Sequence, residues 1–201
     1  MFEKNYPQTY ILKNGQEVTI RLLSPQDEDE MFRFFQSLPE ADLNYFRADV
    51  RTPEVIRKWT KQIDFERRIP LVVFHGMRMI GEWALLHREH GWSRHVCELR
   101  GIVHPDWRNL GLGNKLIYDL LTIAHEIEKE KVIVEVVAQQ KFVIQRFEKL
   151  GFQREALFRN HVKDARGRLQ DLLVLSMELV PAWKKMEELI HDRADHGAGG
   201  G

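Results

Sequence analysis

One short segment constrains the fold of this chain more than any other. Between Glu98 and Leu116 it places a strand-like stretch, a turn, a glycine-containing loop and an amphipathic helix in immediate succession. Helix N-termini leave backbone N–H groups unpaired and carry partial positive charge. Glycines let the backbone approach a phosphate closely. The spacing Arg108-x-x-Gly111-x-Gly113 at the helix start is therefore typical of a pyrophosphate-binding loop.

Two other phosphate-binding motifs do not fit this segment. A dinucleotide-binding fingerprint needs a third glycine where the chain has Leu116. A Walker loop needs a lysine after its last glycine, and here Asn114 follows Gly113. Paired glycines at a helix start also occur as tight turns without a ligand, so a plain turn is the alternative that the spacing leaves open.

The patterns on either side predict alternating strands and helices. Alternating or continuous apolar stretches predict strands at residues 17–23, 69–75, 79–86, 96–104, 132–137, 154–162 and 169–179. Start signals and helical spacing predict helices after Ser24-Pro25, after Thr52-Pro53, at residues 112–127 and 142–150, and from Pro181 to about His191. This order predicts an α/β (α+β) fold with a single mixed, mostly antiparallel sheet of about six to seven strands and helices on both faces.

Length and composition predict one cytoplasmic domain. Of the 201 residues, we expect 1–180 to form the domain and 181–201 to form a C-terminal helix with a flexible glycine-rich tail. The 30 basic and 30 acidic residues balance, whereas nucleic-acid-binding proteins usually show a basic excess. The single cysteine, Cys97, fits a reducing compartment, and no apolar run approaches the roughly 20 residues that cross a bilayer. We therefore expect no nucleic-acid partner and no membrane partner.

Two motifs in the right order resemble the GNAT superfamily of acyl-CoA N-acyltransferases. The first is Arg108-x-x-Gly111-x-Gly113, which follows a strand ending in Val103-His104-Pro105. The second is the run Phe-Glu-Lys-Leu-Gly-Phe at residues 147–152, which is similar to a family motif that begins with tyrosine. The order of elements over residues 17–179 matches as well. Residues 27–46 also loosely resemble the bacterial protein-lysine acetyltransferases.

The resemblance implies acetyl-CoA as co-substrate, without a metal. The backbone of Ile102 and Val103 would hold the pantetheine arm like an added strand, and an N–H near Val103 would polarise the acyl carbonyl. Gln140 stands where the family usually has asparagine and would hydrogen-bond the pantetheine. The amides that would hold the pyrophosphate belong to Arg108, Asn109, Leu110, Gly111, Leu112, Gly113 and Asn114.

The resemblance also implies a catalytic residue. Glu98 lies ten residues before Arg108, where the protein-lysine acetyltransferases place a catalytic glutamate. An amine is protonated at neutral pH and must lose that proton before it attacks a thioester, and a nearby carboxylate can accept it. We therefore predict that Glu98 is the general base. The alternative is an ordinary solvated glutamate on a strand.

The chain departs from the family at Phe147. Many family members have a tyrosine there that reprotonates the leaving thiolate, which a phenylalanine cannot do. We still expect Phe147 to line the cofactor site. A thiol with a pKa of about 8.5 can leave without a proton, so the departure affects the detail of the mechanism more than the class of reaction.

Histidine, cysteine and tryptophan residues elsewhere in the chain give weaker support for a metal site or a substrate groove. A zinc site needs convergent ligands, usually in tight pairs, and the sequence offers only a loose group, His87, His90, His95 and Cys97. No metal site is predicted. Cys97 is expected to pack in the core, because its side chain and that of Glu98 point to opposite faces of a strand. Three tryptophans could line a substrate groove, although core packing is the usual role: Trp83, Trp92 and Trp107.

Together these features predict an acetyltransferase that transfers an acetyl group from acetyl-CoA to a primary amine by direct attack. A protein lysine is the first candidate acceptor, with a small-molecule amine or a protein N-terminus close behind. One alternative is a non-catalytic acyl-CoA-binding regulatory module, which Phe147 favours and Glu98 opposes. Another is an interaction domain that binds no ligand. A homodimer contact could form through Trp183, Met186 and Ile190.

Overall fold

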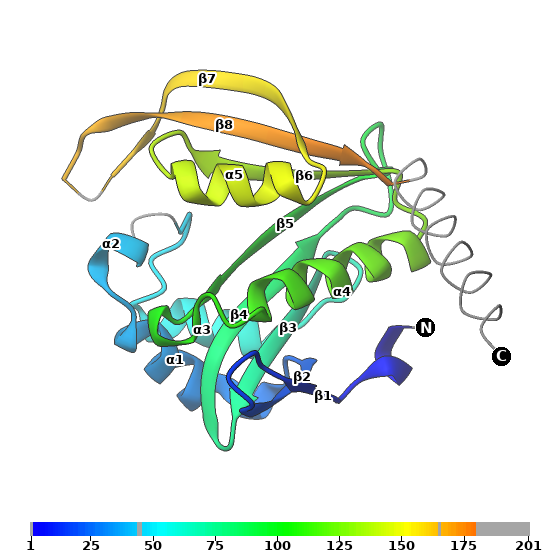
Figure 1. The fold of residues 1–201 in the computed structure, drawn as a ribbon, viewed down its shortest axis with the longest axis vertical. Helices are drawn as coiled ribbons and strands as arrows, with labels where there is room; N and C mark the ends of the chain where they lie inside the picture. Colours follow the sequence, from blue (N-terminus) through cyan, green and yellow to red (C-terminus); the bar gives the residue numbers. More distant parts are fainter. Residues whose placement is uncertain (1, 44–45, 165, 180–201) are drawn as a thin grey trace, which may run out of the picture.

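Eight strands form one sheet in the order β1-β2-β3-β4-β5-β6-β8-β7 (Figure 1). They are β1 (Gln8–Ile11), β2 (Glu17–Leu22), β3 (Arg68–His75), β4 (Arg78–Leu86), β5 (Val96–Val103), β6 (Lys131–Val137), β7 (Gln153–Lys163) and β8 (Leu169–Glu178). All neighbouring pairs are antiparallel except β5 and β6. The predicted fold is confirmed, with one strand more than predicted. The additional strand is β1, whose four residues carry no apolar pattern.

The computed structural model describes residues 2–43, 46–164 and 166–179. The predicted segment 181–201, its helix from Pro181 and the dimer contacts proposed there lie outside these residues. No helix in the described ranges is long and apolar enough to cross a bilayer.

Helices cover both faces of the sheet (Figure 1). They are α1 (Glu28–Ser37), α2 (Glu40–Leu43), α3 (Pro53–Lys61), α4 (Leu112–Glu126) and α5 (Lys141–Lys149), with short 3-10 turns η1 (Phe2–Asn5), η2 (Pro25–Asp27) and η3 (Pro105–Trp107). One apolar cluster joins α4 and α5 to one face, and a second joins α1 and α3 to the other. The two prolines predicted to start helices, Pro25 and Pro53, do stand at helix starts.

The sheet opens between β5 and β6. These two strands are parallel and pair at only three positions, the last of which is Glu98 with Ile133. On its other edge, β5 stays paired with β4 as far as Val103. Beyond Glu98, therefore, β5 has one edge that pairs with no strand. Figure 1 shows β5 running between α5 and α4, with its far end toward the loop that leads into α4.

Candidate functional site

The loop before α4 presents a row of unpartnered backbone donors. Gly111 stands at the start of α4 with φ of 91°, a conformation that side chains other than glycine's rarely allow. Within the described residues, no backbone N–H from residues 109–113 donates to an acceptor, whereas those of Asn114 and Lys115 bond the carbonyl of Gly111. The free donors lie at the positive end of the α4 dipole. The loop is therefore able to bind an anion.

Arg108 fixes this loop in place through its side chain. Its Nε donates to the carbonyl of Val103 at 3.0 Å, and its Nη2 donates to Asp42 Oδ2 on α2 at 2.8 Å. The guanidinium thus ties the loop to the end of β5 and to α2. The contribution predicted for Arg108 was its backbone amide, and that N–H bonds the carbonyl of Pro105 at 3.1 Å.

Arg146 brings a cation to the loop from α5. Its Nε donates to Asn114 Oδ1 at 2.8 Å. Its Nη2 lies 3.0 Å from where a Cβ on Gly113 would be, so glycine leaves the room that the guanidinium occupies. Burial lowers the pKa of Arg146. No carboxylate of the described residues forms an ion pair with it, which is unusual for a cation beside the positive end of a helix.

Sequence reasoning missed Arg146, although a signal was present. It lies three residues after Val143 and four before Leu150, on the face of α5 that also carries Phe147. Val143, Leu150 and Phe147 all pack in or against the core cluster. An arginine on an otherwise apolar face is a pattern that could have identified it.

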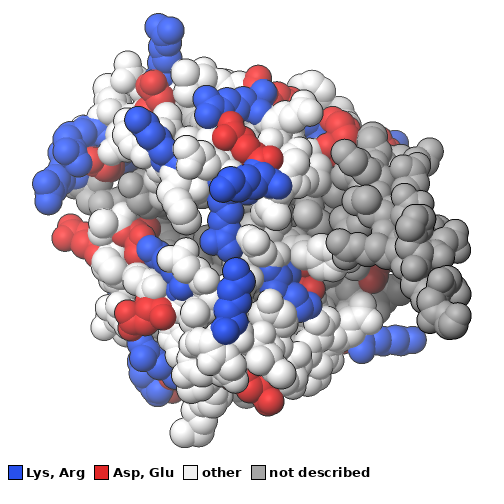
Figure 2. Space-filling view, in the orientation of Figure 1, with Lys and Arg blue, Asp and Glu red and all other residues white. Residues whose placement is uncertain are grey.

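The turn between β1 and β2 reaches the other side of the loop. The Lys13 N–H donates to the Leu110 carbonyl at 3.1 Å. The Lys13 side chain and the Tyr10 hydroxyl both lie within 4 Å of where a Cβ on Gly111 would be. Figure 2 shows basic side chains gathered down the middle of the face on which α4 and α5 lie. The loop therefore lies between cations from two elements distant in sequence.

The residues predicted to hold the pantetheine arm follow the opening between β5 and β6. Ile102 and Val103 occupy the free end of β5, with Ile102 packed toward α1 and Val103 toward α4. Gln140 stands at the start of α5, and its side chain makes no hydrogen bond to the helix end. Phe147 is buried, with its ring centroid 6.3 Å from that of Trp83 and 5.1 Å from that of Phe152.

Glu98 lies at the end of the β5–β6 pairing, on the α1 face of the sheet. Arg100 donates to both of its carboxylate oxygens, at 2.5 and 2.7 Å. Arg47, from the segment after α2, lies 3.7 Å from the same carboxylate and also pairs with Glu135 on β6. One guanidinium therefore bridges carboxylates on the two strands that separate. Glu135 is the one charged residue in the predicted strand 132–137, and no motif in the sequence assigns it a role.

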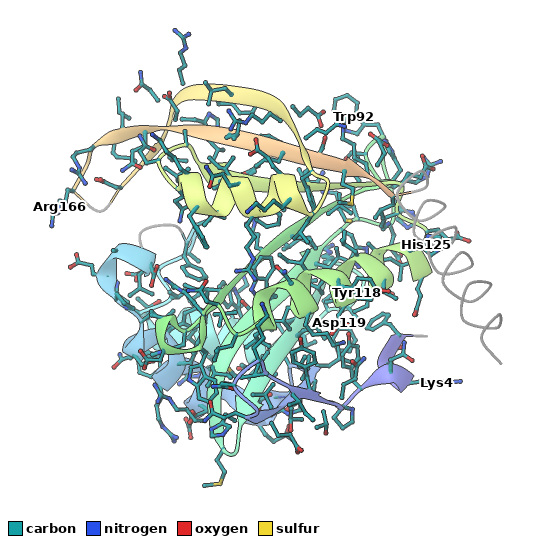
Figure 3. All side chains as sticks on the ribbon, viewed as in Figure 1. Lys4, Trp92, Tyr118, Asp119, His125 and Arg166 are labelled. Atoms are coloured by element: carbon teal, nitrogen blue, oxygen red, sulfur yellow. The ribbon has the colours of Figure 1, made fainter. Side chains whose placement is uncertain are left out.

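A pocket adjoins this ion-pair group on the α2 side. It has a volume of about 240 Å³ and lies between the segment after α2 and the start of the β7–β8 turn. Its polar lining residues are Arg47, Asp49, Arg51, Lys163 and Asp164. Figure 3 labels Arg166 in the same turn, at the end of the sheet toward α2. Arg47 is thus shared between this pocket and the ion pairs of Glu98 and Glu135.

The remaining candidate residues lie away from the opening or in the core. Cys97 is buried, and burial raises the pKa of its thiol to about 12. Trp107 is buried against His75, with 4.7 Å between ring centroids. Trp92 is 93% exposed in the turn before β5, at the closed end of the β5–β6 pair (Figure 3). Within the described residues, no three His, Cys, Asp or Glu side chains are grouped to hold a metal ion.

Comparison with known proteins identifies the family. The model of the acetyltransferase (GNAT) family matches residues 31–152. The GNAT domain of PAT from S. lividans superposes with a TM-score of 0.71 at 16% identity, over 87% of this chain and 97% of that one. The structure of yncA from Salmonella typhimurium with acetyl-CoA gives a TM-score of 0.66 at 20% identity, over 81% and 94%. A ribosomal-protein-S5-alanine acetyltransferase from Vibrio fischeri gives 0.70 at 13%, over 81% and 93%.

The solved structures share the fold, and the family model covers more than half of the chain, including the loop before α4 and the Phe147 motif. This chain belongs to the GNAT acetyltransferase family.

Proposed function

We propose that this protein transfers an acetyl group from acetyl-CoA to a primary amine, and that a protein lysine is the first acceptor to test. The supporting observation is the row of N–H groups at residues 109–113 that have no acceptor in the described part of the chain, and that Arg146 approaches from α5. A pyrophosphate would satisfy the donors and the cation together. The yncA structure, which contains acetyl-CoA in the same fold, adds to this argument.

The opening of the sheet suits an extended ligand. Backbone N–H and C=O groups of a strand edge bind an extended chain as a further strand would. The free edge of β5 starts after Glu98 and ends at Val103, next to the loop that would hold the pyrophosphate. Ile102 and Val103 are the residues we propose for the pantetheine arm, and Gln140 is available from the start of α5.

Glu98 is our proposed general base. It accepts a proton from the ammonium of the acceptor, and the freed nitrogen lone pair then bonds to the thioester carbon while the C–S bond breaks with its electrons on sulfur. The nitrogen, still carrying one proton too many, loses that proton to water or to the leaving thiolate, which yields the neutral amide. Arg100 and Arg47 hold the Glu98 carboxylate at the opening. Glu135 is a second carboxylate at the same place, bridged to Glu98 by Arg47, and it is the other residue to test.

Two glutamine variants separate these roles. We expect Glu98→Gln to lower kcat by about a hundredfold or more without changing the Kd for acetyl-CoA, because glutamine keeps the size but cannot accept the proton. Glu135→Gln should lower kcat less. Glu66→Gln, at an exposed position outside the ion-pair group of Glu98 and Glu135, is the matched control. Full turnover by Glu98→Gln at pH 7 would remove Glu98 as the base.

A second function is favoured by one observation, the absence of a polar atom on Phe147. A regulatory module that binds acyl-CoA without turnover needs the loop but no proton-transfer group. The two functions differ in one measurement, the release of free CoA thiol from acetyl-CoA in the presence of a panel of amines. Release with any amine supports the transferase, whereas saturable binding without release supports the module.

The first test is a calorimetric titration with acetyl-CoA, using acetyl-pantetheine as a ligand that lacks the nucleotide and pyrophosphate. Binding that depends on the nucleotide half is the expected result. If millimolar acetyl-CoA does not bind, both functions are excluded. The amine panel should include a lysine peptide, a peptide with a free N-terminus and a polyamine, because the acceptor is the least constrained part of the proposal.

A further inference from the structure

Trp83 carries a buried donor that has no partner among the residues that the structure describes. Its indole Nε1 is shielded from solvent and makes no hydrogen bond within the described residues. Only two other side-chain atoms there share this property, on His87 and Asp119. The large majority of buried side-chain polar atoms are paired, so an exception calls for an explanation.

The Trp83 ring lies next to the part of β5 where the sheet opens. Trp83 on β4 pairs with Gly101 on β5, and a Cβ on Gly101 would collide with the indole. The ring therefore lies across β5 at a residue without a side chain. Gly101 is three residues beyond Glu98, the last residue of β5 that pairs with β6.

On its other side the indole approaches α5. The ring centroids of Trp83 and Phe147 are 6.3 Å apart, so the indole lies between β5 and α5. Phe147 offers no hydrogen-bonding atom to it. Trp83 as a whole is half-buried, so the ring borders the surface even though its nitrogen is covered. The donor therefore lies over the part of β5 whose other edge pairs with no strand.

We propose that the Trp83 indole N–H donates a hydrogen bond to the sulfur of the bound thioester and of the thiolate that leaves. This inference rests on the proposed function. As the C–S bond breaks, its electron pair moves to sulfur, and a donor aimed there stabilises the developing charge. The indole keeps its own proton. Trp83 would thus be a catalytic residue, contributed by a neighbouring strand rather than by α5.

Nuclear magnetic resonance tests the contact without turnover. The indole resonance of Trp83 is assigned in the wild-type protein from its cross-relaxation with Phe147, and the protein is titrated with CoA and with desulfo-CoA, which lacks the sulfur. CoA should move the indole proton downfield, and desulfo-CoA should move it much less at equal saturation. Equal shifts for both ligands would overturn the proposal while leaving CoA binding intact.

Kinetics provide a second, independent readout. Trp83→Phe removes the N–H and keeps an aromatic ring, and we expect kcat to fall about tenfold with little change in KM for acetyl-CoA, as for the loss of one hydrogen bond to a charged group. The Kd for CoA should rise more above pH 8.5 than at pH 6.5, because the thiolate is the better acceptor. Trp92→Phe, at the exposed tryptophan, is the control.

A double variant distinguishes hydrogen bonding from packing. Phe147→Tyr places a hydroxyl beside the same ring, so combining it with Trp83→Phe should restore most of kcat. Loss of kcat that Phe147→Tyr does not restore, together with equal shifts for the two ligands, would assign Trp83 to packing alone. If the wild-type protein binds no CoA in the same titration, the proposed function fails and this inference fails with it.

Discussion

Arg146 is the single residue whose environment points most directly to a ligand. Its guanidinium lies against Gly113, near the positive end of the α4 dipole, and its one described hydrogen bond goes to a neutral amide on Asn114. A cation placed there is repelled in the free protein and attracted by a bound anion. Its effects on stability and on binding should therefore have opposite signs.

We predict that Arg146→Gln lowers the affinity for acetyl-CoA by about tenfold, as expected for the loss of a charge-assisted hydrogen bond. The same change should leave the free energy of unfolding unchanged or raise it by about 0.5 kcal/mol, because repulsion at the helix end is relieved. Calorimetry and urea denaturation measure the two quantities. Arg159→Gln, on the exposed strand β7, should change neither.

The burial of Cys97 predicts that its thiol is unreactive in the folded protein. Cys97 should therefore add no background signal when free CoA thiol is measured. Burial raises the pKa of its thiol to about 12, and its Sγ lies 3.6 Å from the Lys131 carbonyl. Because only a thiolate reacts readily, Cys97 should resist aromatic disulfide reagents at pH 8 in the folded protein and react within minutes in urea. Rapid reaction of the folded protein would contradict its burial.

At the scale of elements, the start of α1 depends on one buried carboxylate. Burial raises the pKa of Asp27, but hydrogen bonds from Arg21 and from the Ser24 N–H outweigh it, so the pKa lies below its ordinary value of 3.8. Arg21 donates to both carboxylate oxygens, at 2.6 and 2.7 Å. The carboxylate thereby joins β2 to the turn that begins the helix.

We predict that Asp27→Asn lowers the free energy of unfolding by roughly 1–3 kcal/mol at pH 7. A lowered pKa means that the folded state binds fewer protons than the unfolded state, so the stabilisation is fully present above pH 3.8 and is lost as pH falls further. The difference between wild type and variant should therefore close in strong acid. Asp29→Asn, at an exposed position of α1, is the control for urea denaturation at each pH.

At the scale of the whole molecule, the site joins parts that are distant in sequence. Three elements meet at one place: the turn after β1, helix α5, and the loop that precedes α4. Strands β5 and β6 form the opening beside them. A ligand that contacts all of them binds the folded state only. Its binding should therefore stabilise the whole chain.

Acetyl-CoA at a hundred times its Kd should stabilise the protein by about 2.7 kcal/mol. For a chain of this size, that corresponds to a rise in Tm of about 5–10 °C. A thermal melt monitored by circular dichroism measures the rise, and acetyl-pantetheine at the same concentration should give a smaller one. An unchanged Tm with acetyl-CoA would argue against the proposed site.

The sequence alone determined the elements whose patterns are local. Apolar strands such as β3, helical spacing in α4 and the glycine spacing of the loop each lie within one stretch, so the fold and the family could be predicted. The short strand β1 was missed because a four-residue edge strand has no pattern of its own. Glu98 as base and the residues for acetyl-CoA stay predictions.

Only the tertiary structure decided which distant residues meet. Sheet pairing fixes where β5 and β6 separate, and so brings Glu135 to the same guanidinium as Glu98. It also lays Trp83 across Gly101. Helix packing places Arg146 against the loop before α4. Local periodicity sets the face on which a side chain lies, whereas its neighbours depend on the register between strands and on how helices pack over them.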